Sequence, residues 1–167
     1  KKIKITDPKR HSDVLRNKSV IVNQTDRLDT LRKTVASSIK NVKDGEILAS
    51  DELFETVNNL VEFPTAILCE FAQKFLNLPE EIIKNTIKKQ KNLIIVDGKI
   101  KKILTYFIGV KDGISTNIES IRDGYEKVIT ARLEDAEFYF KNDTKTKLEE
   151  KVERLKGIVF QEKLGTV

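Results

Sequence analysis

Residues 131–143 read Ala131-Arg132-Leu133-Glu134-Asp135-Ala136-Glu137-Phe138-Tyr139-Phe140-Lys141-Asn142-Asp143, and the rest of the chain is organised around this stretch. Read as a helix that continues from Tyr125, the stretch places its apolar side chains on one face at the i, i+3, i+4, i+7 spacing. That face consists of Tyr125, Val128, Ile129, Leu133, Ala136, Tyr139 and Phe140. Phe138 lies on the opposite side, so either the helix is covered on both sides or Phe138 belongs to an interface with a missing part of a longer protein, and we favour the interface.

Arg132 falls inside this apolar face. A guanidinium group there is costly unless it meets a carboxylate, a cluster of carbonyl groups or a partner's phosphate. Asp135, one turn further along the helix, is the nearest candidate. We therefore expect a structural ion pair between Arg132 and Asp135.

The length and composition predict one compact domain, because 167 residues with 39% hydrophobic content are enough for one ordinary core. The net charge of +5 is too small to indicate nucleic-acid binding by itself. The charge is unevenly distributed, however. Seven lysines and only one acid, Asp97, lie between Lys84 and Lys102, and the remainder of the chain nets −1.

The single cysteine and the single histidine exclude several kinds of site. Cys69 can form no disulfide within the chain, and it resembles a small buried hydrophobic residue in a protein of the reducing cytoplasm. Together with His11 it cannot build a His/Cys zinc site or a Cys-His nucleophile, so we expect no metal. Glu134, Asp135 and Glu137 diverge around a helix, and no glycine loop cradles a phosphate, so we expect no catalytic residue.

No apolar stretch is long enough to span a bilayer, and the N-terminus lacks the apolar region of a signal peptide. The chain starts at Lys1 and contains no methionine, which suggests an excised piece of a longer polypeptide. We therefore expect further parts of the protein to lie outside this sequence.

The element pattern predicts an α+β fold with a mixed, largely antiparallel sheet covered by helices. Capping residues and helical spacing predict helices in segments 11–18, 25–39, 50–61, 78–89, 116–142 and 148–155. We expect strands in segments 1–6, 19–22, 65–71, 92–96 and 103–110, and the continuous apolar run at 65–71 is typical of an interior strand. Asp97-Gly98 is the strongest hairpin signal, and it joins the last two of these strands.

The lysine cluster has two interpretations that the sequence leaves open. Lysines beside an exposed hairpin protect its edge from aggregation. Alternatively they contact RNA phosphates, where each lysine adds salt-sensitive affinity, with Tyr106 or Phe107 as a stacking platform.

Several motifs together resemble one known family. They are the segment Leu133–Asp143 quoted above, Leu148-Glu149, and Val159-Phe160-Gln161-Glu162-Lys163-Leu164-Gly165-Thr166. Upstream agreement occurs at Gly124–Val128, Leu78–Glu81, Val61–Pro64 and Val20–Val22. In this combination the chain resembles, over nearly its whole length, the beta subunit of bacterial heterotetrameric glycyl-tRNA synthetase.

The resemblance implies that the full protein is a subunit of a cytoplasmic class II ligase that joins glycine to tRNA(Gly). Its partners would be the alpha subunit, the remaining beta-subunit domains and tRNA, and ATP with magnesium would be used at the alpha subunit. The chain would be one internal domain, residues 1–167, similar to the B3/B4 module of phenylalanyl-tRNA synthetase. Residues 1–24 would be a lead-in, and residues 157–167 would begin the connection to an HD-type domain.

The resemblance leads to three hypotheses. The domain supports glycylation by contacting tRNA phosphates through Lys88, Lys89, Lys91, Lys101 and Lys102, or by positioning neighbouring domains. Alternatively it is a purely structural docking module that uses the face bearing Phe138. The third hypothesis is an editing hydrolase, by analogy with the module of phenylalanyl-tRNA synthetase. Similarity of fold does not by itself transfer function, however. Because glycine is the smallest amino acid, an editing site that selects by size would have few wrong amino acids to reject. Asn92 and Tyr125 depart from the family's usual residues, so no family role is carried over to them.

Overall fold

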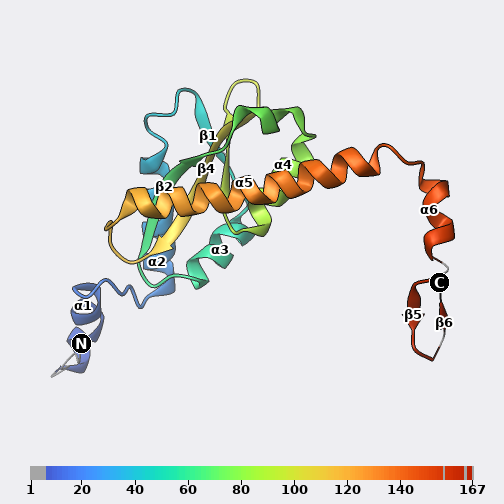
Figure 1. Ribbon diagram of the computed structural model, residues 1–167. Helices are drawn as coiled ribbons and strands as arrows, with labels where there is room; N and C mark the ends of the chain where they lie inside the picture. The colour runs from blue at the N-terminus through green and yellow to red at the C-terminus, as the bar shows by residue number, and fades with distance from the viewer. Residues whose placement is uncertain (1–6, 156, 164, 167) are drawn as a thin grey trace. The chain divides into compact units, whose positions relative to one another are not determined.

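The computed structural model describes residues 7–155, 157–163 and 165–166, which form two compact units (Figure 1). The larger unit ends at Leu133 and the smaller begins at Glu134, so the division falls within the long helix α5 (Ile118–Asp143). The extent of the domain in the full protein stays a prediction. The expected strand at residues 1–6 lies outside the described residues.

The larger unit is built on a four-stranded sheet with the order β1-β3-β4-β2, in which every pairing is antiparallel. Its strands are β1 (Gly45–Leu48), β2 (Pro64–Glu70), β3 (Leu93–Asp97) and β4 (Ile103–Asp112). Its helices, besides α5, are η1 (Pro8–Arg10), α1 (His11–Arg16), α2 (Gln24–Ser38), α3 (Asp51–Asn59), η2 (Gln73–Asn77) and α4 (Glu80–Lys89). The predicted α+β fold with a largely antiparallel sheet is confirmed.

The two faces of the sheet are covered by different helices. Ile108 on β4 packs in a buried cluster with Leu31 of α2 and Phe54 of α3. Because side chains alternate along a strand, the neighbouring Gly109 points to the opposite face, where it meets α5. Each fully buried aliphatic side chain in such a core contributes roughly 1.5–3 kcal/mol.

Local sequence signals set several helix starts. The Ser50 side chain accepts a hydrogen bond from the Leu53 N–H at 3.2 Å, which is the cap expected for α3. Glu80 and Glu81 follow Pro79 in the first turn of α4, where acids favour the positive end of the helix dipole. The predicted strand at 19–22 is wrong, because the structure has no strand there, and β1 was not expected.

The β3–β4 hairpin is confirmed, and its loop is stabilised by Asp97. The carboxylate of Asp97 accepts hydrogen bonds from the backbone N–H of Lys99 at 2.8 Å and of Ile100 at 3.0 Å. These two hydrogen bonds, first that from Ile100 and then that from Lys99, lower the pKa of Asp97. Lys101 adopts a left-handed conformation, with φ of 57°, before the chain enters β4.

Strand β2 lies at an edge of the sheet, so the expected interior position is wrong. Its free edge is instead covered by polar side chains of α5. Arg122 Nε donates a hydrogen bond to the Leu68 carbonyl at 3.0 Å, and the Glu70 N–H donates to a Glu126 carboxylate oxygen at 2.9 Å. An edge strand can be strongly apolar here because a helix, rather than another strand, satisfies these backbone groups.

Tyr125 anchors α5 on β4. A Cβ atom on Gly109 would lie 2.9 Å from ring atoms of Tyr125, so the ring packs directly against the glycine backbone. The Tyr125 hydroxyl donates a hydrogen bond to the Val110 carbonyl at 2.8 Å, and burial raises the pKa of this hydroxyl. This close approach brings α5 down onto the sheet.

The face of α5 that packs against the sheet is rotated about the helix axis relative to the predicted face. Ile129 and Leu133 are fully buried, as expected, but Val128 and Arg132 are exposed. The expectation of a core-facing guanidinium is therefore wrong, because the buried seam runs through Tyr125, Ile129 and Leu133 and passes beside Arg132. Asp135 is also exposed, and its pairing with Arg132 stays a prediction.

The smaller unit comprises the end of α5, helix α6 (Leu148–Leu155) and the two short strands β5 (Val159–Gln161) and β6 (Gly165–Thr166). The Phe138 and Tyr139 rings form an edge-to-face pair with centroids 5.5 Å apart, and both side chains are exposed. On α6, Leu148, Val152 and Leu155 recur at helical spacing and are exposed as well. This unit therefore presents apolar side chains that its own described residues do not cover.

We expect Gly109→Ala to destabilise the chain by about 1–3 kcal/mol, because the added methyl group would overlap the Tyr125 ring. Thermal unfolding measures the change. Gly124→Ala is the matched control, since a Cβ there would meet nothing within 4 Å and the change should stabilise the helix by about 0.5–1 kcal/mol. An unchanged melting temperature for Gly109→Ala would contradict the packing of Tyr125.

Candidate functional site

The clustered lysines divide into two groups at opposite ends of β3. Lys88 and Lys89 end α4, and Lys91 follows them; we call these three the α4-end lysines. Lys99, Lys101 and Lys102 lie in the loop after β3, and we call them the hairpin lysines. A five-residue strand spans roughly 16 Å, so the two groups do not form one compact patch. Their contact with RNA stays a prediction.

Two of the three hairpin lysines are paired with acids that lie in β1 or directly before it. Lys99 Nζ lies 2.9 Å from a carboxylate oxygen of Asp44, and Lys101 pairs with Glu46 on β1. Both pairs are at the surface, where an ion pair contributes little to stability. They nevertheless reduce the positive charge that this end of β3 offers to a phosphate.

The α4-end lysines are not compensated in this way. Within the part of the chain that the structure describes, no acid forms an ion pair with any of the three. Lys84, one turn earlier, differs, because its Nζ lies 3.1 Å from both Glu80 and Glu81. Three cations within four residues therefore remain available to an external anion.

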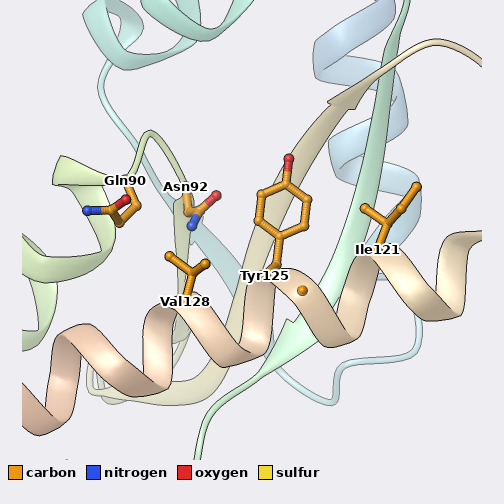
Figure 2. Close-up of a pocket in the computed structure, with 6 residues that line it drawn as sticks. Gln90, Asn92, Ile121, Tyr125 and Val128 are labelled. Atoms are coloured by element: carbon orange, nitrogen blue, oxygen red, sulfur yellow. The ribbon is translucent and has the colours of Figure 1, made fainter.

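A groove with a volume of about 440 Å³ lies between α5 and the turn that joins α4 to β3 (Figure 2), whereas Lys88 and Lys91 line a separate hollow with Glu52 of α3. The lining residues are Gln90, Asn92, Ile121, Gly124, Tyr125 and Val128. Most of the lining is apolar and is supplied by α5. The turn takes its shape from Lys91, whose left-handed φ of 58° ends the helix and directs the chain into β3.

Asn92 is the unusual member of this lining, because its side chain is 2% exposed yet carries an amide. Figure 2 shows this amide between Tyr125 and Val128, whereas that of Gln90 points away from α5. None of the described residues forms a hydrogen bond with the Asn92 side chain. Among the described residues, the buried side-chain polar atom without a hydrogen-bond partner is Oδ1 of Asn58 and not an atom of Asn92, so the Asn92 amide is open to the groove, where water can reach it.

The sequence carries two signals at this groove, at Asn92 and at Gly124. Asn92 directly precedes four apolar residues, Leu93–Val96, all of which are buried in the sheet. Gly124 interrupts a helix in which other residues would be more stable. A polar residue at the start of a buried strand and a glycine within a helix both indicate a constraint other than stability.

A second cavity, of about 310 Å³, lies at the β2 edge. It is bordered by Cys69, whose thiol is buried, and burial raises the pKa of this thiol to about 11. A protonated thiol is a poor nucleophile, and the neighbouring Glu126 is already engaged with the Glu70 N–H. This cavity therefore lacks an activated nucleophile.

No cluster of three or more His, Cys, Asp or Glu side chains that could hold a metal ion occurs among residues 7–155, 157–163 and 165–166. Within the same ranges, no helix is both long enough and apolar enough to cross a bilayer.

We expect the Cys69 thiol to react about 100-fold more slowly with iodoacetamide at pH 8 in the folded chain than in denaturant. The pKa rises from 9.0 to about 11 on folding, so the thiolate fraction falls by about that factor. Because the folded-state pKa lies above the unfolded one, stability should also decline as the pH rises above about 9. Equal alkylation rates in the two states would contradict the burial of this thiol.

Comparison with known proteins gives consistent results over the whole chain. The family model described as "Glycyl-tRNA synthetase beta subunit" matches residues 1–167. A glycine–tRNA ligase beta subunit of Oenococcus oeni is 37% identical over 166 residues, covering 99% of this chain and 24% of that protein. The corresponding protein of Listeria welshimeri is 34% identical over 163 residues, and that of Natranaerobius thermophilus 37% over 165, each covering 98% of this chain and 24% of the relative. The chain thus spans about a quarter of the length of these relatives.

Proposed function

Since the chain belongs to the family of glycyl-tRNA synthetase beta subunits, we propose that it is a non-catalytic domain of a glycine–tRNA ligase that contacts tRNA(Gly) and positions neighbouring domains. The whole enzyme would be a class II synthetase of the cytoplasm, with alpha and beta subunits in a heterotetramer. Glycine activation with ATP and magnesium would occur at the alpha subunit. The chain itself would supply neither catalytic residue nor cofactor.

The observation that carries the tRNA contact is the uncompensated charge of the α4-end lysines. Phosphate contacts of this kind release counterions, so their affinity falls steeply with salt. The hairpin lysines would contribute less, because Asp44 and Glu46 already neutralise two of them. The proposed contact is therefore centred on the end of α4, and Lys101 and Lys102 lie at its margin.

A second role, docking of other beta-subunit segments, is supported by the apolar side chains of the smaller unit. Phe138 is 62% exposed and Leu148 is 79% exposed, although both are large hydrophobic residues. About three quarters of the length of the relatives lies outside this chain and could supply the covering surface. The editing hydrolase has no such support, because the thiol at the β2 edge stays protonated.

We expect the triple variant Lys88→Glu, Lys89→Glu and Lys91→Glu in the full enzyme to raise the KM for tRNA about ten-fold or more at low salt. Each reversed charge removes a phosphate contact and adds a repulsion. Exchange of pyrophosphate into ATP with glycine but without tRNA should not change. The matched control reverses Lys33, Lys40 and Lys43, which are also exposed lysines of the larger unit. Equal effects of the two triple variants would contradict a contact centred on α4.

We expect Phe138→Ser combined with Leu148→Ser to weaken the association of the smaller unit with other parts of the beta subunit. Loss of apolar contact area should lower the melting temperature of the full subunit by several degrees. Ile100→Ser is the control, because Ile100 is 65% exposed in the hairpin loop of the larger unit. If the double variant melts like this control, the docking role is wrong.

A further inference from the structure

The hollow that Lys88 and Lys91 line lies between α3 and the end of α4. Its volume of about 170 Å³ is below the range of about 300–1,000 Å³ for pockets that hold a whole small molecule. It therefore suits one charged group rather than a complete ligand. We call it the α3–α4 hollow, and its lining consists of Ser50, Glu52, Leu53, Thr56, Lys88 and Lys91.

The charges in the α3–α4 hollow favour an anion with a single negative charge. Lys88 and Lys91 form no ion pair within the part of the chain that the structure describes. Among the same residues, Glu52 lines this space but pairs with neither lysine. Two positive charges and one negative charge leave +1, which one phosphodiester group neutralises. A phosphate monoester, with a charge of about −1.5 to −2 at pH 7, exceeds it.

The Thr56 hydroxyl is a donor that the fold leaves available. Thr30 in α2 and Thr86 in α4 each donate their hydroxyl hydrogen to the carbonyl four residues earlier, at 2.7 Å. Thr56 is likewise a half-buried helical residue, but its hydroxyl makes no hydrogen bond within the described ranges. The Ser50 oxygen accepts from the Leu53 N–H, which leaves its own hydrogen to donate as well. The hollow thus offers two hydroxyl groups beside two ammonium groups.

The backbone conformation of Lys91 indicates that its side chain has a use. Helix α4 ends in a Schellman motif, in which the Lys91 N–H donates to the Lys88 carbonyl at 2.9 Å and the Asn92 N–H to the Ile87 carbonyl at 3.3 Å. This motif requires a left-handed residue, here with φ of 58°, and glycine adopts that conformation most readily. Helix termination therefore does not explain a lysine at this position, whose side chain lines the hollow.

A phosphate group fits these donors better than a carboxylate group does. Its oxygens are arranged tetrahedrally, so donors from α3 and from the end of α4 can reach different oxygens at once. A carboxylate holds its two oxygens in one plane and is matched best by the planar fork of an arginine, which this lining lacks. The family of the chain, glycyl-tRNA synthetase beta subunits, makes tRNA the expected source of the phosphate.

We infer that the α3–α4 hollow seats one backbone phosphate of the tRNA, held by the ammonium groups of Lys88 and Lys91 and by the hydroxyl group of Thr56. This inference rests on the proposed tRNA contact and adds α3 to it. Glu52 repels the same phosphate and so limits the strength of the contact. Because a phosphate contact positions a nucleic acid without reading its sequence, the hollow orients the tRNA rather than selects it.

Removal of the Thr56 hydroxyl tests the inference in the full enzyme. Thr56→Val keeps the volume of the side chain, and we expect it to raise the Kd for tRNA about five-fold, because a charge-assisted hydrogen bond is lost. The dependence of log Kd on log salt should not change, since no charge is removed. Thr30→Val is the matched control, because the Thr30 hydroxyl is already bonded to the Asp26 carbonyl within α2.

Removal of the Glu52 charge should have the reverse effect. We expect Glu52→Gln to lower the Kd for tRNA about three-fold at low salt, because the repulsion of the phosphate disappears. Glu55→Gln is the matched control, since it removes the same charge from an exposed position of α3 outside the hollow lining. Damage to the fold does not tighten a complex, so this gain separates an electrostatic role from a structural one.

Lys91→Gly separates tRNA binding from stability. Glycine suits the left-handed conformation, so the melting temperature should not fall. The Kd for tRNA should rise about ten-fold at low salt, and the slope of log Kd against log salt should decrease by about 1. Lys89→Gln is the control, because Lys89 is a neighbouring α4-end lysine that does not line the hollow, and it should change the Kd much less.

Chemical probing of the bound tRNA identifies the occupant. Ethylnitrosourea ethylates accessible phosphate oxygens, and we expect one phosphate to be protected in the wild-type complex. The same phosphate should become reactive with Thr56→Val and with Lys91→Gly. An identical pattern for the wild type and both variants would overturn the inference.

Two further results distinguish the ways in which the inference can fail. If reversal of the three α4-end lysines weakens tRNA binding while Thr56→Val and Glu52→Gln behave like their controls, only the phosphate site in the hollow is wrong. If the lysine reversal has no effect either, the proposed tRNA contact fails as well. Weaker subunit association with unchanged tRNA binding in Lys91→Gly would identify a protein carboxylate as the occupant and overturn the inference.

Discussion

The packing of α5 against the sheet is the constraint on which the larger unit depends. Tyr125 sits on the bare backbone of Gly109, while Arg122 and Glu126 satisfy backbone groups at the free edge of β2. One helix thus covers a face and closes an edge. The same contact buries the thiol of Cys69 and keeps it neutral, since charging it would require desolvating a thiolate.

Much of the fold could be predicted from local chemistry. Ser50 caps α3 and Asp97 shapes the hairpin because each hydrogen bond involves residues close in sequence. The position of β2 could not be predicted this way. Its apolar run is typical of an interior strand, but what makes an edge position possible is a guanidinium and a carboxylate more than fifty residues away. Whether a strand lies at the edge or in the interior of a sheet therefore depends on tertiary contacts, which the strand's own residues do not determine.

The inner face of α5 shows a similar limit. The apolar residues at 125, 128, 129 and 133 allow either of two adjacent faces of the helix to be the buried one, and Tyr125 belongs to both faces. The choice between them depends on Gly109, which admits the Tyr125 ring and so rotates Val128 and Arg132 out of the core. The awkward position of Arg132 in the predicted face was itself a sign that the phase was wrong, because an exposed arginine needs no special partner.

The candidate site shows why closeness in sequence is a weak guide to a binding surface. The lysines between residues 84 and 102 look like one basic patch, yet β3 separates them, and Asp44 and Glu46 neutralise part of the hairpin group. Exposed charged residues are common, and each changes the stability of the fold little, so their presence does not distinguish a solvated face from an interface.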